Sequence, residues 1–309
     1  MTQKIIIDTD IGDDIDDAFA LLLAMHNDMD IIGITTVFKN TEERARIAKL
    51  LMKKFGGKYK NVPVYAGYGT PLAENGEKYP HTCQYTDALD SDDLDPDSSN
   101  PEDAVDFIIE SCKKYQDQLT IIPIGPFTNI AKVIQKDKDA LALVGKIVIM
   151  GGAYFKQYVD WNVLCDVEAA KIMFENLENI HCIGADVTHL LRLNAEDDEK
   201  ISAYVGNSAA EYVKKLYLLW KKSTNSIGVL HDPLAVYYAM DETICVCESA
   251  PVVLIDEGLA RGITLNVKAY GKSYLNKAYE CFDFSKQHIL AKEVDRERMI
   301  RTFMKCFEK

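Results

Sequence analysis

Short runs of apolar, mostly β-branched residues alternate along the chain with longer stretches in which apolar residues recur every three or four positions. The first pattern predicts buried strands and the second predicts helices. Strands are predicted at 4–7, 31–37, 62–65, 119–124, 146–149 and 181–183. Helices are predicted at 18–26, 41–55, 101–114, 127–135, 167–176, 195–222 and 295–307. Strands that alternate with helices indicate an α/β fold with a parallel, doubly wound sheet covered on both faces.

One segment departs from this alternation. Residues 73–100 hold few apolar residues and many Asp, Ser, Asn and Pro, which predicts a long surface loop. No repeat, low-complexity linker or block of like charge divides the rest of the sequence. We therefore expect a single domain over residues 1–309.

The charge balance and the cysteine pattern narrow the class of protein. Asp and Glu number 48 against 35 Lys and Arg, so the net charge of −13 disfavours binding to nucleic acid. No run of 18 uncharged apolar residues predicts a membrane span, and the start of the chain lacks the pattern of a signal peptide, so we expect a cytoplasmic protein. The 8 cysteines are scattered without a C-x-x-C pair, which favours reduced thiols over disulfides or a structural zinc site.

Six aspartates crowd the segment between the first predicted strand and the first predicted helix. They are Asp8, Asp10, Asp13, Asp14, Asp16 and Asp17. A helix N-terminus stabilises one or two carboxylates, but six like charges need a cation or protons to offset their repulsion. The carboxyl end of a parallel strand is also where open α/β sheets bind ligands. Hard oxygen donors at this density predict a site for Ca²⁺ or Mg²⁺.

Two other classes of acidic loop were compared with this one. An EF-hand requires Gly at its sixth and Glu at its twelfth position, and counting from Asp8 these are Asp13 and Phe19, so that class is excluded. A metal-dependent phosphatase of the aspartyl-phosphate type also carries Asp-x-Asp after its first strand and uses the first Asp as nucleophile. That alternative stays open, although it leaves Asp16 and Asp17 unexplained.

A series of short motifs follows the acidic loop. They are Thr36–Asn40, Val62–Gly67, Pro123–Asn129, Met150–Gly152, Asp160–Asn162, Asp166–Ala170, Asp186–Thr188 and His231–Ala235. Together with Asp8-Thr-Asp10-x-Gly12 and Asp16-Asp17-Ala18, they resemble the motifs of the nucleoside hydrolases, the inosine–uridine-preferring N-ribohydrolases, in that family's order. The resemblance implies a Rossmann-like fold with a mixed, mainly parallel sheet flanked by helices, assembled as a homodimer or homotetramer. It also implies Ca²⁺-dependent hydrolysis of the N-glycosidic bond of a small-molecule ribonucleoside or related riboside, giving ribose and a free base.

The same resemblance implies roles for individual residues. The Ca²⁺ ligands would be the carboxylates of Asp10, Asp17 and Asp232 and the backbone carbonyl of Ile124. Asp10 would also take a proton from the attacking water. Substrate would be bound by Asp16, Asn40, Met150, Asp160 and Asn162, with Asp160 standing where the family has Glu. His231 would face the leaving base and donate a proton, or else serve only a structural role.

Three departures from the family pattern affect the substrate. The acidic loop carries two extra residues, so Asp13 and Asp14 could be the functional pair in place of Asp16 and Asp17. The segment from 152 to 160 is shorter than usual, and Lys39 stands where Gly normally precedes the Asn. A non-nucleoside sugar substrate and a non-catalytic sugar-binding relative therefore stay as alternatives. Trp161 is expected in the core or on the ribose, and His189 at the surface or in packing.

Overall fold

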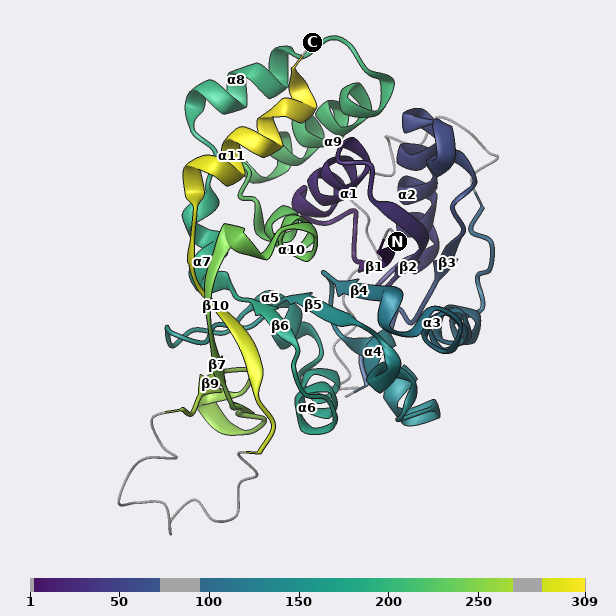
Figure 1. Cartoon of the computed structure of the whole chain (residues 1–309). Coiled ribbons are helices and arrows are strands. Elements are labelled where there is room, and N and C mark those ends of the chain that lie inside the picture. Colours follow the sequence, from purple (N-terminus) through teal and green to yellow (C-terminus); the bar gives the residue numbers. More distant parts are fainter. Residues whose placement is uncertain (1–2, 73–94, 269–284, 309) are drawn as a thin grey trace.

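The computed structural model describes residues 3–72, 95–268 and 285–308, and its centre is a mixed sheet of eight strands (Figure 1). In spatial order the strands are β3 (Val64–Ala66), β2 (Asp30–Thr36), β1 (Lys4–Thr9), β4 (Leu119–Pro123), β5 (Lys146–Met150), β6 (His181–Ile183), β10 (His288–Val294) and β7 (Cys245–Ala250). All neighbours run parallel except β10 and β7. The short strands β8 (Val252–Leu254) and β9 (Thr264–Asn266) form a separate antiparallel pair. The predicted mixed, mainly parallel sheet is confirmed.

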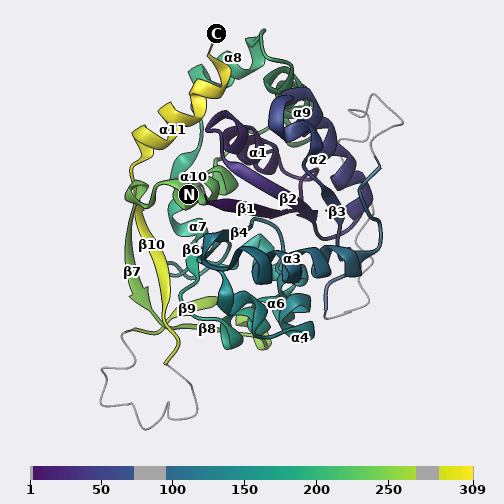
Figure 2. The same ribbon diagram turned by 45° about the vertical axis from the view of Figure 1, so that its right-hand side comes forward.

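Helices cover both faces of the sheet, as Figures 1 and 2 show. One face carries α1 (Asp16–His26), α2 (Thr41–Phe55), α9 (Ser208–Thr224) and α10 (His231–Met240). The other carries α3 (Pro101–Tyr115), α4 (Thr128–Lys136) and α6 (Val167–Asn176). The remaining helices are α5 (Trp161–Cys165), α7 (Ala185–Thr188), α8 (Ala195–Ala203) and α11 (Arg296–Met304).

Strand β1 is apolar at consecutive positions because both of its faces are buried. Its side chains alternate between the two faces of the sheet, so Ile5 and Ile7 join the core under α1, while Ile6 joins the core under α3 and α4. All three are buried because helices cover both faces. The run of β-branched residues thus fixes β1 at the centre of the sheet.

The elements predicted from the sequence form close to their expected positions, but the stretch 195–222 was predicted as one helix, whereas α8 ends at Ala203 and α9 begins at Ser208. The break arises because the side chain of Asn207 accepts hydrogen bonds from the backbone N–H groups of Ala209 and Ala210, which caps a new helix. Several elements were not predicted, namely α5, α7, α10, β7, β8, β9 and β10. Of these, β10 and β7 supply the antiparallel edge of the sheet.

The long loop predicted at 73–100 lies mostly outside the described residues, since 73–94 are not among them. Residues 95–100 contain no helix or strand and only an isolated bridge from Ser98 to Tyr65. The prediction of a single domain over 1–309 stays a prediction. What matters for the site is that β1, β4 and β5 run parallel, so the segments that follow them meet at one edge of the sheet.

Candidate active site

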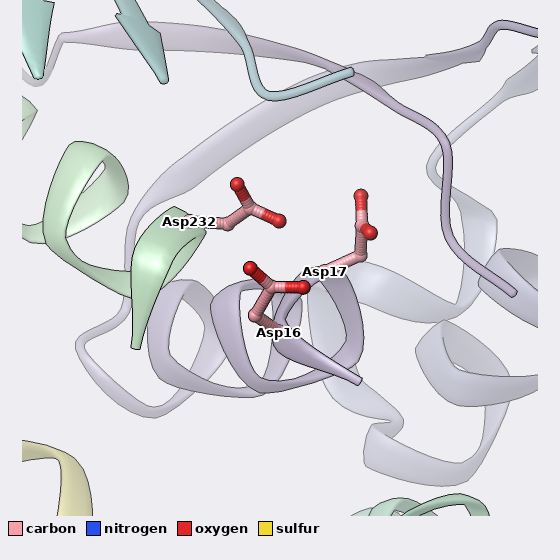
Figure 3. A group of neighbouring side chains, drawn as sticks. All are labelled: Asp16, Asp17 and Asp232. Carbon is pink, nitrogen blue, oxygen red and sulfur yellow. The ribbon is translucent and has the colours of Figure 1, made fainter. Parts of the chain in front are cut away.

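Three buried aspartates from two helices meet at this edge of the sheet (Figure 3). Asp16 and Asp17 form the first turn of α1, and Asp232 lies in the first turn of α10. One carboxylate oxygen from each lies within 4.8 Å of the others. The exposed fractions of the three residues are 6%, 2% and 3%, so water screens their charges poorly. We call Asp16, Asp17 and Asp232 the carboxylate cluster.

Burial and mutual repulsion make the carboxylate cluster electrostatically unfavourable on its own. Burial, followed by the neighbouring carboxylates, raises the pKa of Asp16, Asp17 and Asp232 well above the ordinary value for Asp. The hydroxyl of Thr9 donates a hydrogen bond to Asp17 and offsets a small part of this. Three clustered hard oxygen donors fit a divalent cation such as Ca²⁺, which would remove the repulsion.

Asp10 lies beside the cluster, in the loop that follows β1. Burial raises its pKa to about 6, while the positive charge of Arg44 acts in the opposite direction. The turn after β4 approaches closely, because a Cβ placed on Gly125 would lie only 2.9 Å from Oδ1 of Asp10. The carbonyl of Ile124, in the same turn, accepts a hydrogen bond from Nδ2 of Asn162 at 2.8 Å. Asp10, Ile124 and Asn162 are thus brought together, as the sequence predicted.

Asp13 has a different surrounding from the carboxylate cluster. Its Oδ2 lies 2.6 Å from Nζ of Lys39 and 2.9 Å from Nη2 of Arg44. The guanidinium of Arg44 is buried and also donates to the carbonyls of Phe38, Asp10 and Ile11. We call Asp13, Lys39 and Arg44 the ion-pair cluster. Within the described residues, Asp16 and Asp17 meet Asp232, while Asp13 and Asp14, the alternative pair, line the pocket outside this group.

The residues expected to bind ribose divide into two groups. Asp160, Asn162 and Met150 line a pocket of about 700 Å³ together with Asp10 and the carboxylate cluster. Asn162 donates to the carbonyl of Met150 at 3.1 Å, and Asp160 caps α5 by accepting from the N–H of Val163 at 3.2 Å. Burial raises the pKa of Asp160, an effect opposed by backbone N–H groups that hydrogen bond to its carboxylate.

Asn40 does not line the pocket, unlike the other predicted substrate-binding residues. Its side chain instead accepts a hydrogen bond from the N–H of Glu43 at 3.3 Å and caps α2. Lys39, its neighbour, does line the pocket. Lys39 and Phe38 adopt φ angles of 60° and 66°, in the left-handed region that favours the glycine expected before this asparagine. Lys39 therefore adopts a left-handed backbone conformation at the position where the family has glycine.

His231 lines the pocket beside the carboxylate cluster. Its Nδ1 lies 2.6 Å from the hydroxyl of Thr188, and burial, followed by the nearby His189, lowers its pKa to about 3. The ring of His189 meets that of His231 nearly edge-on, with centroids 5.1 Å apart. Tyr158 in turn reaches Nδ1 of His189 at 3.0 Å. Tyr158 and His189 line the same pocket, and we call Tyr158, His189 and His231 the aromatic wall.

The sequence did not place His189, Tyr158 or Trp220 in the site, although all three line the pocket. His189 was expected at the surface or in packing, and Trp161 was expected either in the core or on the ribose. Trp161 is 54% exposed and lines the pocket, so it is not a core residue. The periodicity of apolar residues could not reveal Trp161 or His189 as site residues, because each lies at the end of a short helix.

Asp8 lies inside the sheet rather than in the pocket. Its Oδ1 accepts from the hydroxyl of Thr35 at 2.6 Å and from Nδ2 of Asn129 at 2.7 Å, and burial raises its pKa to about 7. Asp8 is fully buried and does not line the pocket, so the structure does not place it where the phosphatase alternative needs its nucleophile.

The fold and the pocket define an α/β protein whose acidic site lies at the carboxyl edge of a mostly parallel sheet. A family model described as inosine-uridine preferring nucleoside hydrolase matches residues 5–301. The chain belongs to this family, which confirms the resemblance inferred from its motifs.

Curated relatives and solved structures agree with this assignment. Uridine nucleosidase 1 from Arabidopsis thaliana is 32% identical over 281 residues, covering 85% of this chain and 81% of the relative. The inosine-uridine preferring nucleoside hydrolase of Leishmania major is 30% identical over 281 residues, with 86% and 88% coverage. A plant nucleoside hydrolase structure has a TM-score of 0.81 at 25% identity, and a purine-preferring ribonucleoside hydrolase from Gardnerella vaginalis has 0.78 at 27%. They cover 99% of this chain and 99% and 98% of their own chains.

The protein is thus an N-ribosyl hydrolase whose substrate is a small-molecule nucleoside. Within the described ranges, every helix is too short or too polar to cross a lipid bilayer. The residue roles, the metal and the assembly state stay predictions.

Proposed function

We propose that the protein hydrolyses the N-glycosidic bond of a ribonucleoside with the help of Ca²⁺. The carboxylates of Asp10, Asp17 and Asp232 and the carbonyl of Ile124 would hold the ion. The observation that carries this proposal is the carboxylate cluster, in which three buried acidic side chains share one small space. When bound, Ca²⁺ supplies a hard positive charge that would orient the oxygen atoms of the attacking water and of the ribose hydroxyls.

The chain's own residues supply the remaining chemistry. In the reaction the bond from C1′ to the base nitrogen breaks, its electron pair leaves with the base, and a water oxygen bonds to C1′. Asp10 accepts a proton from that water, and the departing base takes up a proton, so that one water is consumed overall. Positive charge develops on the ribosyl ring as the bond breaks. The carboxylates that line the pocket, among them Asp10 and Asp160, stabilise that charge.

Ribose would be held on the other side of the pocket. Asp16 would accept hydrogen bonds from ribose hydroxyls, while Asn162 and Asp160 would bind the same sugar from the segment that begins α5. Asn162 supports this role because its amide is already oriented by the carbonyls of Ile124 and Met150. Holding the sugar in one orientation lowers the entropic part of the activation barrier, because its motion is already restricted on binding. Asn40 would act indirectly, by fixing the turn that carries Lys39.

The first experiment is an assay for release of reducing sugar. Protein stripped of metal is assayed with inosine, uridine, adenosine, cytidine and p-nitrophenyl riboside, with and without added Ca²⁺, and with Mg²⁺ as the control ion. The proposal predicts release that is lost on stripping and restored by Ca²⁺. Full activity without any divalent ion would contradict the metal assignment. Absence of release from every riboside in the presence of Ca²⁺ would contradict the substrate.

The assembly state and the location form a separate part of the proposal. The family resemblance supports a homodimer or homotetramer, and the proposed location is the cytoplasm. Light scattering on the purified full chain tests the first of these, and a mass of 34.7 kDa, that of one chain, would contradict it.

A further inference from the structure

The aromatic wall is a connected series of side chains from three separate segments. Tyr158 comes from the segment between β5 and α5, His189 directly follows α7, and His231 begins α10. The rings of Tyr158 and His189 lie 5.4 Å apart with an angle of 33°, and those of His189 and His231 lie 5.1 Å apart with an angle of 77°. Such contacts restrict the middle ring from both sides. His189 is therefore the most firmly oriented exposed ring of the wall.

The orientation of the Tyr158 hydroxyl determines which nitrogen of His189 carries the proton. This hydroxyl lies 3.0 Å from Nδ1 of His189, and a phenol can either donate to this nitrogen or accept from it. In the arrangement that we infer, Tyr158 donates and Nδ1 accepts. In a neutral imidazole the other nitrogen must carry the hydrogen, so Nε2–H of His189 is a donor. Among the described residues Nε2 has no hydrogen-bond partner.

His231 differs from His189 in its surroundings. Its Nδ1 is engaged by the hydroxyl of Thr188 at 2.6 Å, and its side chain is more buried than that of His189. Its ring meets the ring of His189 at a steep angle and so supports it. His189, by contrast, is exposed while lining the pocket, so a ligand can reach it.

We propose that His189 is a specificity-determining residue for the leaving group, which donates a hydrogen bond from Nε2–H to an acceptor atom of the nucleobase. The inference rests on the proposed function and deepens it. Nucleobases carry ring nitrogens and carbonyl oxygens on which negative charge accumulates as the bond to C1′ breaks. A fixed donor aimed at this charge stabilises the transition state more than the bound substrate. Tyr158 is then a positioning residue, because it sets the tautomer of His189.

Substrates with different leaving groups distinguish a donor role of His189 from a merely structural role. A p-nitrophenolate spreads its negative charge over its own ring and nitro group, so it departs with little help from a donor. Uridine and inosine release bases that lack this internal stabilisation. Loss of the His189 donor should therefore slow the nucleosides much more than p-nitrophenyl riboside, whereas a distorted pocket would slow all three alike.

The test compares His189→Phe with wild type on uridine, inosine and p-nitrophenyl riboside in the presence of Ca²⁺. Phenylalanine keeps an aromatic ring against His231 but cannot donate a hydrogen bond. We expect kcat on the two nucleosides to fall on the order of 10²-fold, with a loss of about threefold or less on p-nitrophenyl riboside. His189→Gln, which restores an N–H donor, should recover about a tenth or more of the lost activity. Tyr158→Phe should shift the ratio in the same direction by about three- to tenfold.

The matched control is His26→Phe, the same substitution at an exposed histidine that ends α1 outside the pocket. It should leave all three rates at the wild-type level. Equal losses on nucleosides and p-nitrophenyl riboside in His189→Phe, or no loss on either, would overturn the role of His189 while the proposed function stands. A wild-type protein that hydrolyses none of the three substrates would overturn both proposals together.

Discussion

The carboxylate cluster and the ion-pair cluster grow from the same acidic loop but neutralise its charge in different ways. Asp13 meets two cations of the chain itself, Lys39 and Arg44, within 2.9 Å. Asp16 and Asp17 meet Asp232 instead, and the neighbouring carboxylates raise the pKa of both, an effect that the charge of Arg44 opposes at Asp17. The difference separates a charge that the chain neutralises with its own cations, which stabilises the loop, from the carboxylate cluster, which we propose binds Ca²⁺.

The largest expected effect comes from a substitution in the carboxylate cluster. Asp17→Asn removes one of the proposed Ca²⁺ ligands and keeps the size of the side chain. We expect kcat/KM for nucleosides to fall by on the order of 10³-fold, which corresponds to about 4 kcal/mol of transition-state stabilisation. Isothermal titration should show weakened Ca²⁺ binding in parallel. Wild-type Ca²⁺ affinity together with wild-type rates would contradict the assignment of Asp17.

The next largest effect is a loss of stability when the ion-pair cluster loses its buried cation. Arg44→Met leaves Asp13 and three backbone carbonyls without their buried donor. Because the guanidinium is only 2% exposed, we expect a loss of about 3–5 kcal/mol in the free energy of unfolding, measured in urea. The matched control is Arg46→Met, on the same helix, whose pair with Asp95 is exposed and should contribute less than about 1 kcal/mol. Equal losses in the two variants would contradict the prediction.

When Ca²⁺ is absent, the same Asp→Asn substitution should change the free energy of unfolding in opposite directions in the two clusters. Asp17→Asn removes a repulsive charge and should stabilise the metal-free protein by about 1 kcal/mol or more. Asp13→Asn leaves Lys39 and Arg44 without their anion and should destabilise it by about 1–2 kcal/mol. Urea unfolding in Ca²⁺-free buffer measures both. Changes of the same sign would mean that the two clusters do not differ in the way described.

The dependence on pH sharpens this contrast. The folded-state pKa of Asp17 is raised, so the metal-free folded protein binds a proton more readily than the unfolded chain does. The stability linked to Asp17 is therefore fully present below the ordinary pKa of 3.8 and is lost as the pH rises through the raised value. Unfolding experiments should show the advantage of Asp17→Asn over wild type growing from pH 5 to pH 8. An advantage that shrinks over this range would contradict the sign.

The smallest expected effect concerns the turn that faces Asp10. In Gly125→Ala the new Cβ would lie 2.7 Å from Cγ1 of Val37 and 2.9 Å from Oδ1 of Asp10, so the carboxylate must shift by a few tenths of an ångström. Such a displacement of a catalytic group should lower kcat by about tenfold, with little effect on the folded fraction. Steady-state kinetics alongside circular dichroism checks this. Unchanged kcat would show that Asp10 tolerates the shift.

The central part of the fold could be predicted from the sequence because its signals are local. The isoleucines of β1 report burial on two faces, and the aspartates after it report an edge of the sheet. The edge strands β10 and β7 gave weaker signals: β7 is partly exposed, and β10 pairs with it from a distant part of the chain. The break between α8 and α9 depends on the cap at Asn207, whose signal was outweighed by the apolar period on either side.

The residues of the site also divide into those that the sequence predicted and those that only the folded structure reveals. The family resemblance grouped Asp10, Asp16, Asp17 and Asp232, and the structure brings Asp16, Asp17 and Asp232 together beside Asp10. The motifs could not decide between Asp13 and Asp16, since that choice depends on where Lys39 and Arg44 fold back. His189 escaped notice for a related reason. Its neighbours Tyr158 and His231 are distant in sequence, so only the folded structure reveals the wall that they form.

The pairing of α1 with α10 at the carboxylate cluster has a consequence for how the protein is made. Asp17 and Asp232 come from opposite parts of the chain, more than two hundred positions apart. A nascent chain that still lacks α10 has only part of the cluster. A ribosome-bound chain whose α10 has not yet emerged therefore cannot complete the carboxylate cluster, so the metal site that we propose forms late in synthesis.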